Sequence, residues 1–231
     1  MLTVSIIVPA YNEQATIIEL LAEVRQQKID GVQFEVIVID DGSTDGTGAL
    51  LEKHPELYDQ LLRQPKNSGK GAAVLAGLQV ATGQYILFQD ADLEYSPSYY
   101  KTLLHPVLAF GADIVMGSRF MVAQYVRVQF FWHKVGNLLI TTIFNLLFNT
   151  TFTDIYSCYL LYRRELVTPS TLRTKGWEQH AEILCNAVRR AKVIYDVPIS
   201  YHGRSYAEGK KIKPTSVIPV FFTILRCRIF C

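Results

Sequence analysis

Short apolar runs of strand length alternate with helix-length segments along the first half of the chain, and this alternation limits the fold more than any other feature. The strand candidates are residues 4–8, 34–39, 60–63, 85–88 and 113–116. Helical stretches lie between them, at residues 13–27, 45–53, 71–81 and 98–109. Asn12 marks the expected start of the first helix, and Ser43 and Thr44 mark that of the second. Strands that alternate with helices in this way are typical of a parallel sheet with crossover helices.

The rest of the chain extends this pattern in a single α/β domain, which we predict to be a mostly parallel central sheet flanked by helices. Two further strands are expected at 157–162 and 193–199, with a helix at 178–190 between them. A length of 231 residues with 49% hydrophobic residues suits one large core, and it leaves too few residues for a second independent domain. The composition changes along the chain, which divides the domain 1–231 into residues 1–117, residues 118–205, and a basic and then apolar tail at 206–231.

A helix expected at residues 135–148 is apolar on nearly all sides. Besides one apolar stripe of helical spacing, it carries Ile140, Phe144 and Phe148 on the opposite face. Such a helix is buried, embedded in a membrane surface or partnered, and burial is the simplest expectation. Both this segment and the apolar run at 217–225 fall short of the roughly 20 residues that span a bilayer. No transmembrane helix is predicted.

Charge and cysteine content narrow the class of protein. A net charge of +2 does not favour a nucleic-acid-binding protein. The four cysteines lack close pairing apart from Cys227 and Cys231, so neither a zinc site nor a disulfide framework is indicated. The first residues run directly into a strand without the pattern of a signal peptide. We therefore expect a reducing, cytoplasmic location.

Polar residues follow three of the predicted strands. They are Pro9-Ala-Tyr-Asn-Glu13, Asp40-Asp-Gly-Ser-Thr-Asp-Gly46 and Gln89-Asp-Ala-Asp-Leu-Glu94. Open α/β sheets bind ligands at the carboxyl ends of their strands, so these segments should meet at one edge. Acidic groups beside a buried strand cost free energy unless they are paired or bind a cation. A divalent metal is the simplest explanation.

Asp90 and Asp92 are the strongest metal candidates. Their spacing places both carboxylates on the same side of a continuing strand, while Ala91 points away. Two carboxylates suit Mg²⁺ or Mn²⁺, which in turn can bind a diphosphate. An isolated Asp-x-Asp is more often a turn or a helix cap, but the neighbouring polar segments favour the metal.

Two further segments have both a functional and a purely structural interpretation. Asp40 and Asp41 either form a turn and a helix cap or bind the base and ribose of a nucleotide. Residues 67–71 are glycine-rich before a helix, but they lack the spacing of a Walker loop, which argues against an ATPase. Lys70 is either a nucleotide or phosphate contact near a helix N-terminus or part of a solvated loop.

The order of these motifs resembles the family 2 glycosyltransferases, most closely their dolichyl-phosphate mannose synthase and polyprenyl-phosphate glycosyltransferase branch. The resemblance rests on residues 9–13, 40–46, 69–71, 90–93 and 117–119, and it continues through 131–133, 136–137, 153–154, 157–159, 197–204 and 208–212. It implies a GT-A type fold and the transfer of a sugar, mannose or glucose, from a GDP- or UDP-sugar to a polyprenyl phosphate. It also implies a peripheral location on the cytoplasmic face of a membrane. Tyr156 and Asn186 depart from the usual pattern, where an acidic residue and a lysine are expected.

The resemblance assigns roles to single residues. Nucleotide contacts are expected from Pro9, Tyr11, Glu13, Asp40 and Asp41, and contacts to the diphosphate and its metal from Lys70, Asp90, Ala91 and Asp92. Glu94 would be a third metal ligand beside Asp90 and Asp92. The basic segment that holds His202, Arg204, Lys210 and Lys211 either closes over the donor phosphates or is a solvated loop.

A phosphate acceptor is already anionic, so it needs guiding cations rather than a base. Arg119, Arg127 and Lys134 could supply them, and the expected catalytic residues are Asp92, Arg119 and Arg127. The alternative for Arg119 is an ion pair with a nearby carboxylate that fixes the loop. The helix at 135–148 and the tail at 217–231 would lie against the membrane interface.

Two other functions remain open from the sequence. One is a family 2 enzyme with a hydroxyl acceptor, which requires a carboxylate as base, with Asp154 or Glu178 as candidates. The other is a non-catalytic subunit that binds nucleotide sugars.

Overall fold

A seven-stranded sheet forms the centre of the molecule in the computed structural model, which describes residues 1–121, 127, 131–204 and 217–230. The strands are β1 (Leu2–Ala10), β2 (Val32–Asp40), β3 (Gln60–Arg63), β4 (Tyr85–Phe88), β5 (Ile114–Ser118), β6 (Leu160–Arg163) and β7 (Ile194–Pro198). Their order is β3-β2-β1-β4-β6-β5-β7. Only β6 runs antiparallel to its neighbours, so the expected mostly parallel sheet is confirmed.

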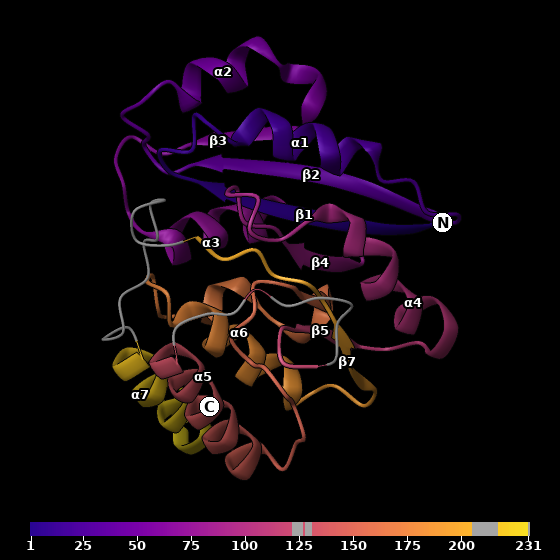
Figure 1. The fold of residues 1–231 in the computed structure, drawn as a ribbon, viewed down its shortest axis with the longest axis vertical. Coiled ribbons are helices and arrows are strands. Elements are labelled where there is room, and N and C mark those ends of the chain that lie inside the picture. Colours follow the sequence, from indigo (N-terminus) through magenta and orange to yellow (C-terminus); the bar gives the residue numbers. More distant parts are fainter. Residues whose placement is uncertain (122–126, 128–130, 205–216, 231) are drawn as a thin grey trace.

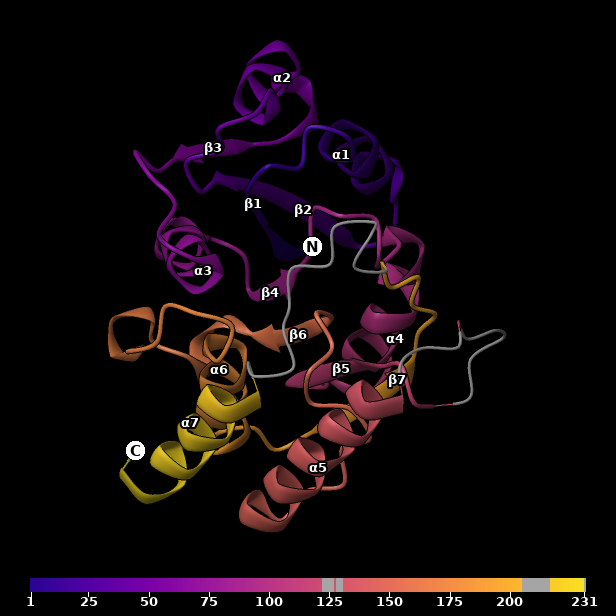
Figure 2. The same ribbon diagram turned by 60° about the vertical axis from the view of Figure 1, so that its left-hand side comes forward.

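Helices cover both faces of the sheet. They are α1 (Ile17–Gln26), α2 (Thr47–Lys53), α3 (Lys70–Val80), α4 (Tyr100–Phe110), α5 (Phe131–Phe148), α6 (Gln179–Val188) and α7 (Val217–Phe230), with short 3-10 turns η1 (Pro55–Leu57), η2 (Pro97–Tyr99), η3 (Arg164–Leu166) and η4 (Pro169–Thr171). In Figure 2, α3 and α6 lie on one side of the sheet, and α1 and α4 lie on the other. This layering is the predicted α/β architecture.

The central strand β1 aligns the polar segments at one edge of the sheet. Its residues Val4, Ile6, Ile7 and Val8 are fully buried, as expected for a strand that is covered on both faces. It pairs in parallel with β2, in a register that ends with Ala10 beside Asp40, and with β4 on its other side. The loops after β1, β2 and β4 therefore start from the same edge.

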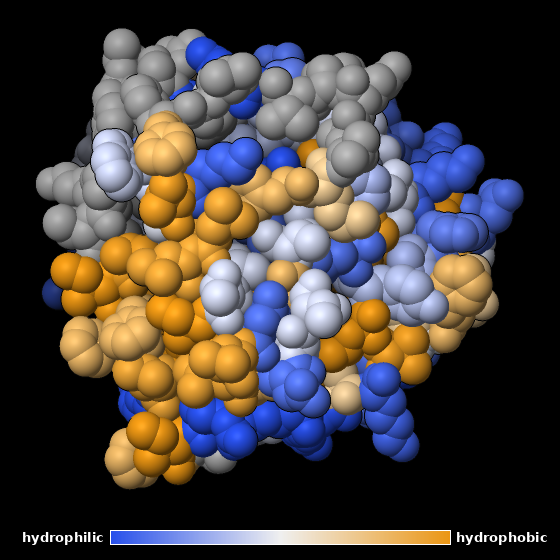
Figure 3. Space-filling view, turned by 60° about the horizontal axis from the view of Figure 1, so that its bottom comes forward, coloured by the Kyte–Doolittle hydropathy of each residue, from blue (hydrophilic) through white to orange (hydrophobic). Residues whose placement is uncertain are grey.

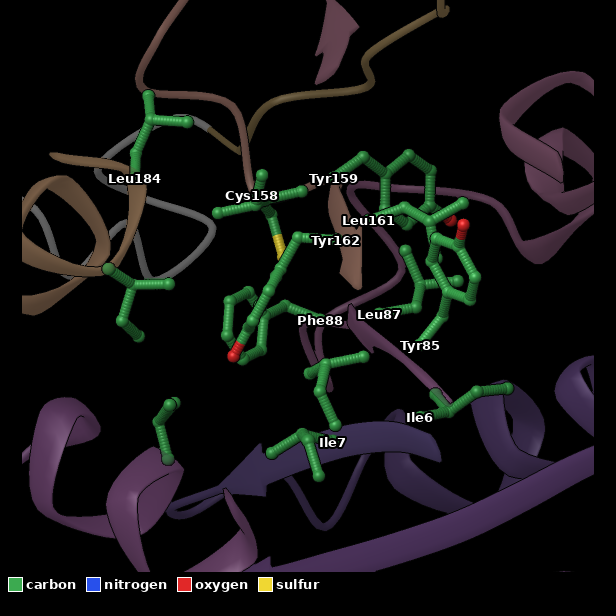
Figure 4. Packing of buried hydrophobic residues seen from close by; sticks show 14 of the residues in the cluster. Ile6, Ile7, Tyr85, Leu87, Phe88, Cys158, Tyr159, Leu161, Tyr162 and Leu184 are labelled. Carbon is green, nitrogen blue, oxygen red and sulfur yellow. The ribbon is translucent and has the colours of Figure 1, made fainter. Parts of the chain in front are cut away.

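A buried amide fixes the loop that follows β4. Figure 4 shows the packed core around Phe88 and Tyr159 where this loop begins. Gln89 is fully buried, and its Oε1 accepts hydrogen bonds of 2.9 Å from the hydroxyls of both Tyr100 and Tyr159. Its Nε2 donates to the carbonyls of Asp90 and Tyr95. Since every polar atom of the amide is used, the loop cannot shift without losing buried hydrogen bonds.

The expected helix caps are wrong. α1 begins at Ile17 and α2 at Thr47, several residues after the side chains that were expected to cap them. Asn12 has a left-handed backbone with φ of 53°, and its Oδ1 accepts the backbone N–H of Thr44 at 2.8 Å. The hydroxyl of Ser43 accepts the backbone N–H of Asn12 at 3.0 Å. These side chains join the loops after β1 and β2 instead of capping helices.

The expectation that the apolar helix is buried is also wrong. Within α5 only Ile140, Thr141 and Phe144 are buried, and Trp132 and Leu146 are 77% and 84% exposed. α5 begins at Phe131, four residues before the predicted start. α7 was not predicted as a helix. Its proline, Pro219, lies in the first turn, where no intrahelical N–H is needed.

Helices α5 and α7 lie side by side at the end of the molecule opposite α2 (Figure 1). Figure 2 shows the same arrangement from a second direction. Within the described ranges, no helix is both long enough and apolar enough to cross a bilayer.

Helix α3 packs against the sheet through Gly77. A Cβ atom at this position would lie 2.8 Å from Ile39 Cδ1 and 2.9 Å from Ile7 Cγ2, in the centre of the core. We expect Gly77→Ala to lower the free energy of unfolding by about 1–3 kcal/mol, because the buried side chains of Ile7 and Ile39 must shift to admit a methyl group. Urea denaturation would measure this. In Gly136→Ala, the added Cβ meets only Val217 at 4.0 Å, so this helical control should not be destabilised. Equal stability of Gly77→Ala and the wild type would contradict the packing described.

Candidate active site

Two adjoining pockets open at the carboxyl edge of the sheet. The smaller has a volume of about 230 Å³ and lies over the loops after β1, β2 and β4. The larger has a volume of about 370 Å³ and extends from there toward α5, α6 and α7. Six residues line both pockets: Pro9, Lys70, Asp90, Glu94, Trp177 and Tyr201.

The smaller pocket gathers most of the residues that were expected to bind the donor. Its lining includes Pro9, Tyr11, Glu13, Asp41, Lys70, Asp90, Ala91, Asp92 and Arg204. Asp40 does not line it. The Oδ1 atom of Asp40 accepts the backbone N–H of Ser43 at 2.9 Å, as in the turn interpretation. Lys210 and Lys211 lie outside the described residues.

Asp41 orders the glycine-rich loop before α3. Its two carboxylate oxygens accept the backbone N–H groups of Ser68 and Gly69, both at 2.9 Å. Burial raises the pKa of Asp41, although these two hydrogen bonds act in the opposite direction. Gly42 must be glycine here, because its φ is 68° and a Cβ atom would lie 2.5 Å from the carbonyl carbon of Lys66.

The start of α3, directly after this glycine-rich loop, contacts the segment before α6. A Cβ atom at Gly71 would lie 2.5 Å from the carbonyl carbon of Lys175, so only glycine permits this approach. The approach brings Lys70 Nζ to 5.0 Å from the centre of the Trp177 ring. A cation at this distance from an indole is stabilised by the ring electrons. The contact closes one wall that both pockets share.

Lys70 and Asp90 form an ion pair at the boundary of the two pockets. Although burial acts in the opposite direction on each group, the pair raises the pKa of Lys70 and lowers that of Asp90. Lys70 is therefore a phosphate contact candidate that an aspartate already positions, rather than a solvated loop residue.

Among the described residues, Asp92 forms no ion pair comparable to that of Asp90 with Lys70. Burial, followed by the nearby charges of Asp90 and Glu94, raises the pKa of Asp92 to about 7. Leu93, between the two acidic residues, has a left-handed backbone with φ of 59°, which is costly for a residue with a Cβ and is often found at functional sites. A bound cation would relieve the repulsion among these carboxylates, so the residues fit a divalent metal.

The expected third metal ligand is directed elsewhere. Glu94 accepts the Tyr201 hydroxyl at 2.6 Å with Oε2 and the backbone N–H of Arg204 at 2.6 Å with Oε1. Among the described residues, no group of three acidic, histidine or cysteine side chains is arranged to hold a metal. Both oxygens of Glu94 bond the segment after β7, so of the three expected metal ligands only Asp90 and Asp92 remain as candidates.

Arg204 holds the segment after β7 across the smaller pocket. Its guanidinium lies 3.2 Å from Glu13 Oε2 and donates a 2.7 Å hydrogen bond to the carbonyl of Asp92. The side chain thus joins the loop after β1 to the loop after β4. Arg204 also lines the smaller pocket.

Arg119 lines the larger pocket, and Asp154 supports it from behind. Nε and Nη2 of Arg119 donate to the two oxygens of Asp154 at 2.7 Å and 2.9 Å, and Asp154 is fully buried. Burial would lower the pKa of Arg119, but the Asp154 carboxylate raises it. The ion pair considered as the alternative for Arg119 is present, and the arginine still faces the pocket. Arg127 is exposed, and its Nη1 donates to the carbonyl of Gly203 at 2.7 Å.

The far wall of the larger pocket is apolar. It is built from Trp132, Val135 and Ile140 of α5, Ile183 of α6 and Val217 of α7. Among the described lining residues, the acidic ones are Asp90 and Glu94. Asp154 and Glu178, the base candidates for a hydroxyl acceptor, do not line it.

Sequence reasoning missed several residues of the larger pocket, above all Trp177, Gln179 and His180. Trp177 is one of only two tryptophans in the chain and follows a glycine, which is a weak signal. The departure at Tyr156 also lies here, with its hydroxyl donating to the carbonyl of Trp177 at 3.1 Å. Asn186 lines neither pocket, and its Nδ2 donates to the carbonyl of Glu182.

Comparison with known proteins connects this geometry to a family. Residues 5–168 match the family model described as glycosyl transferase family 2. A dolichol-phosphate mannosyltransferase of Pyrococcus furiosus is 28% identical over 90% of this chain, which spans 58% of the length of that relative. A polyprenol monophosphomannose synthase of Mycolicibacterium smegmatis is 30% identical over 89% of this chain and 79% of its own length.

The fold is also that of a solved enzyme. Glucosyl-3-phosphoglycerate synthase from Mycobacterium tuberculosis, in complex with Mn²⁺, uridine diphosphate and phosphoglyceric acid, superposes with a TM-score of 0.74. The match covers 100% of this chain and 80% of that chain at 22% sequence identity. This similarity supports the expected GT-A fold.

Proposed function

The chain belongs to glycosyl transferase family 2, and from this premise we propose that it moves a sugar from a nucleotide diphosphate sugar to a polyprenyl phosphate. The observation that carries the proposal is the junction of the two pockets. A pocket lined by the charged residues Asp90, Asp92 and Arg204 adjoins one that combines Arg119 with an apolar wall. The first suits a nucleotide diphosphate, and the second suits a phosphate attached to a hydrocarbon chain.

We assign residues 1–117 mainly to the donor and residues 118–205 mainly to the acceptor. Tyr11, Glu13 and Asp41 of the first part line the donor pocket, while Arg119 and α5 line the acceptor pocket. The division is incomplete, because Trp177 and Arg204 of the second part also line the donor pocket. They link the two halves across the reacting centre.

In the proposed reaction, an oxygen of the lipid phosphate attacks the anomeric carbon in line with the departing diphosphate. The new phosphate–sugar bond forms as the bond between the sugar and the nucleotide diphosphate breaks, with inversion at that carbon. No proton has to be removed from the acceptor, because a phosphate is anionic at neutral pH. The lining of the acceptor pocket is consistent with this, because its acidic residues have other roles. Asp90 pairs with Lys70 and is assigned below to the metal, and Glu94 bonds Tyr201 and Arg204.

Positive groups of the chain would orient the two phosphates. Lys70 and Arg204 face the donor diphosphate, and Arg119, held by Asp154, faces the acceptor phosphate. We also assign Arg127 to the acceptor side. Asp90 and Asp92 would hold a Mg²⁺ or Mn²⁺ ion, which supplies charge against the departing diphosphate.

A donor and acceptor assay tests the proposal against its alternatives. Purified protein would be incubated with radiolabelled GDP-mannose or UDP-glucose, a polyprenyl phosphate and Mg²⁺. We expect the label in the lipid-soluble fraction. Label in a water-soluble product would favour a hydroxyl acceptor, and no transfer with any donor would favour a non-catalytic binding subunit. Either result would overturn the proposed reaction.

We further propose that α5 and α7 dock on the surface of the membrane that holds the acceptor, on its cytoplasmic face. Figure 3 shows apolar side chains gathered over one broad area of this end of the molecule. Exposed members include Leu139 and Leu146 of α5 and Phe222 and Ile229 of α7. Neither helix contains an acidic residue, which suits contact with anionic lipids.

Charged substitutions on this surface test the docking. Replacing both Leu139 and Phe222 with glutamate should weaken binding to anionic phospholipid vesicles by at least about tenfold, because two apolar side chains can no longer enter the interface. Vesicle pelleting would measure the binding. Leu108→Glu is the matched control, since Leu108 is an exposed leucine of α4, a helix that is not part of the proposed docking surface. Unchanged pelleting of the double variant would rule out this surface.

A further inference from the structure

Two buried polar atoms at the start of α6 lack hydrogen-bond partners among the described residues. They are Gln179 Oε1 and His180 Nε2. Both residues line the larger pocket, and Gln179 is only 1% exposed. An unsatisfied buried polar group is unfavourable and usually indicates a missing partner. A ligand in the pocket could supply both hydrogen bonds.

The orientation of the Gln179 amide is fixed by its neighbour. Its Nε2 donates to the carbonyl of Thr174 at 2.9 Å, and a flipped amide would place two oxygens in contact there. Oε1 is therefore the free atom and is an acceptor only. A ligand that satisfies it must present a donor, such as a hydroxyl group.

His180 is held by aromatic packing. Its ring lies 6.0 Å from that of Phe88 and 6.3 Å from that of Tyr156, measured between ring centres. Burial, followed by the nearby charge of Lys70, lowers the pKa of His180 to about 4. The imidazole is thus neutral at physiological pH and can donate or accept one hydrogen bond through Nε2.

The place of these two residues indicates the class of ligand. The larger pocket meets the donor pocket at Lys70, Asp90 and Trp177, so it begins where the diphosphate of the donor would end. The group attached there is the sugar. An amide oxygen and a neutral imidazole suit the hydroxyl groups of a sugar, whereas a phosphate would be better held by Arg119.

We propose that Gln179 and His180 hydrogen-bond hydroxyl groups of the transferred sugar and thereby select which sugar the enzyme accepts. The inference rests on the proposed function, because it takes the donor to be a nucleotide sugar. A site that bonds a particular hydroxyl discriminates strongly against a sugar that lacks it at that position, since the buried atom is then left unpaired.

Calorimetric titration tests this with GDP, UDP, GDP-mannose and UDP-glucose in the presence of Mg²⁺. The variants are His180→Phe, which keeps a ring against Phe88 and Tyr156, and Gln179→Met, which has a similar length. Asn186→Ala is the matched control, because Asn186 is a polar residue of the same helix that lines neither pocket. If His180→Phe fails to fold, His180→Asn provides a smaller neutral replacement at the same position.

We expect each variant to lower the affinity for the nucleotide sugar by about tenfold per lost hydrogen bond, while the affinity for the free nucleotide stays near that of the wild type. The control Asn186→Ala should change neither of these two affinities. An unchanged ratio of the two affinities in the folded variants would overturn the proposed sugar contacts while leaving the proposed function intact. Failure of all four compounds to bind the wild type would overturn the proposed function itself, and with it the sugar contacts.

Discussion

Replacement of Asp92 with asparagine is expected to lower the rate of sugar transfer by about 10²- to 10³-fold. The amide keeps the size of the side chain and can still accept the backbone N–H of Glu94, which Asp92 Oδ1 accepts at 3.2 Å. It removes the negative charge that would hold a divalent cation against the donor diphosphate. The loss should therefore affect metal-dependent binding of the donor rather than folding.

Titration of nucleotide diphosphate with and without EDTA would distinguish a loss of metal-dependent donor binding from a loss of folding. The wild type should bind more tightly with Mg²⁺ or Mn²⁺, whereas Asp92→Asn should show little dependence on metal. Asp30→Asn, at an exposed aspartate that lines neither pocket, is the matched control and should behave as the wild type does. Equal affinity of the wild type with metal and with EDTA would contradict the metal assignment.

The same variant should be more stable than the wild type when metal is absent. The folded state raises the pKa of Asp92 to about 7, above the value near 4 of an unfolded aspartate. The ionised carboxylate therefore costs stability as the pH rises from about 4 to 7, and the full cost remains above pH 7. Thermal denaturation in EDTA should show a higher Tm for Asp92→Asn at pH 8, with the difference lost near pH 4. A lower Tm for the variant at pH 8 would contradict this account of the carboxylate cluster.

Replacement of Asp154 with alanine is expected to lower the free energy of unfolding by about 3–5 kcal/mol. Asp154 is fully buried and accepts hydrogen bonds from Arg119 Nε and Nη2 and from the backbone N–H groups of Arg119 and Tyr156. Its removal leaves the guanidinium of Arg119, whose side chain is only 13% exposed, without its counter-charge. Because Asp154 positions Arg119, acceptor turnover should fall as well.

Chemical denaturation and acceptor kinetics together measure these effects. Asp196→Asn is a suitable control in the same region. Burial raises the pKa of Asp196, and the charge of Asp154 adds to this rise, although two hydrogen bonds from Thr153 act in the opposite direction. Neutralising this group should cost little stability or none. If Asp154→Ala were as stable as the wild type, the buried ion pair would not be the support of Arg119 that the structure indicates.

The sheet and its ligand edge could be predicted from the sequence because they depend on local patterns. β3 (Gln60–Arg63) and β4 (Tyr85–Phe88) have the predicted bounds, and the polar loops after β1, β2 and β4 line one pocket as expected. Strand-length apolar runs and parallel connections constrain these features strongly. The order of the motifs was enough to predict the family.

Contacts between distant segments could not be predicted in the same way. The sequence offered an ion pair for Arg119 as an alternative, but the partner, Asp154, lies 35 positions away. Asn12 and Ser43 were interpreted as helix caps because the same residue types, asparagine and serine, cap helices and bridge loops. Nothing in the sequence marks Gln179 and His180, since their unpaired atoms become evident only once the walls of the pocket are in place.

Mass spectrometry of the lipid product tests the central claim most directly. The purified protein would be incubated with Mg²⁺, a defined polyprenyl phosphate and a panel of GDP- and UDP-sugars. The molecular mass of the extracted lipid would then be compared with that of the starting acceptor. We predict a new species heavier by one sugar residue, with at least one donor, that does not form with Asp92→Asn. An acceptor of unchanged mass with every donor, under conditions in which the protein binds nucleotide, would contradict the proposal that a polyprenyl phosphate receives the sugar.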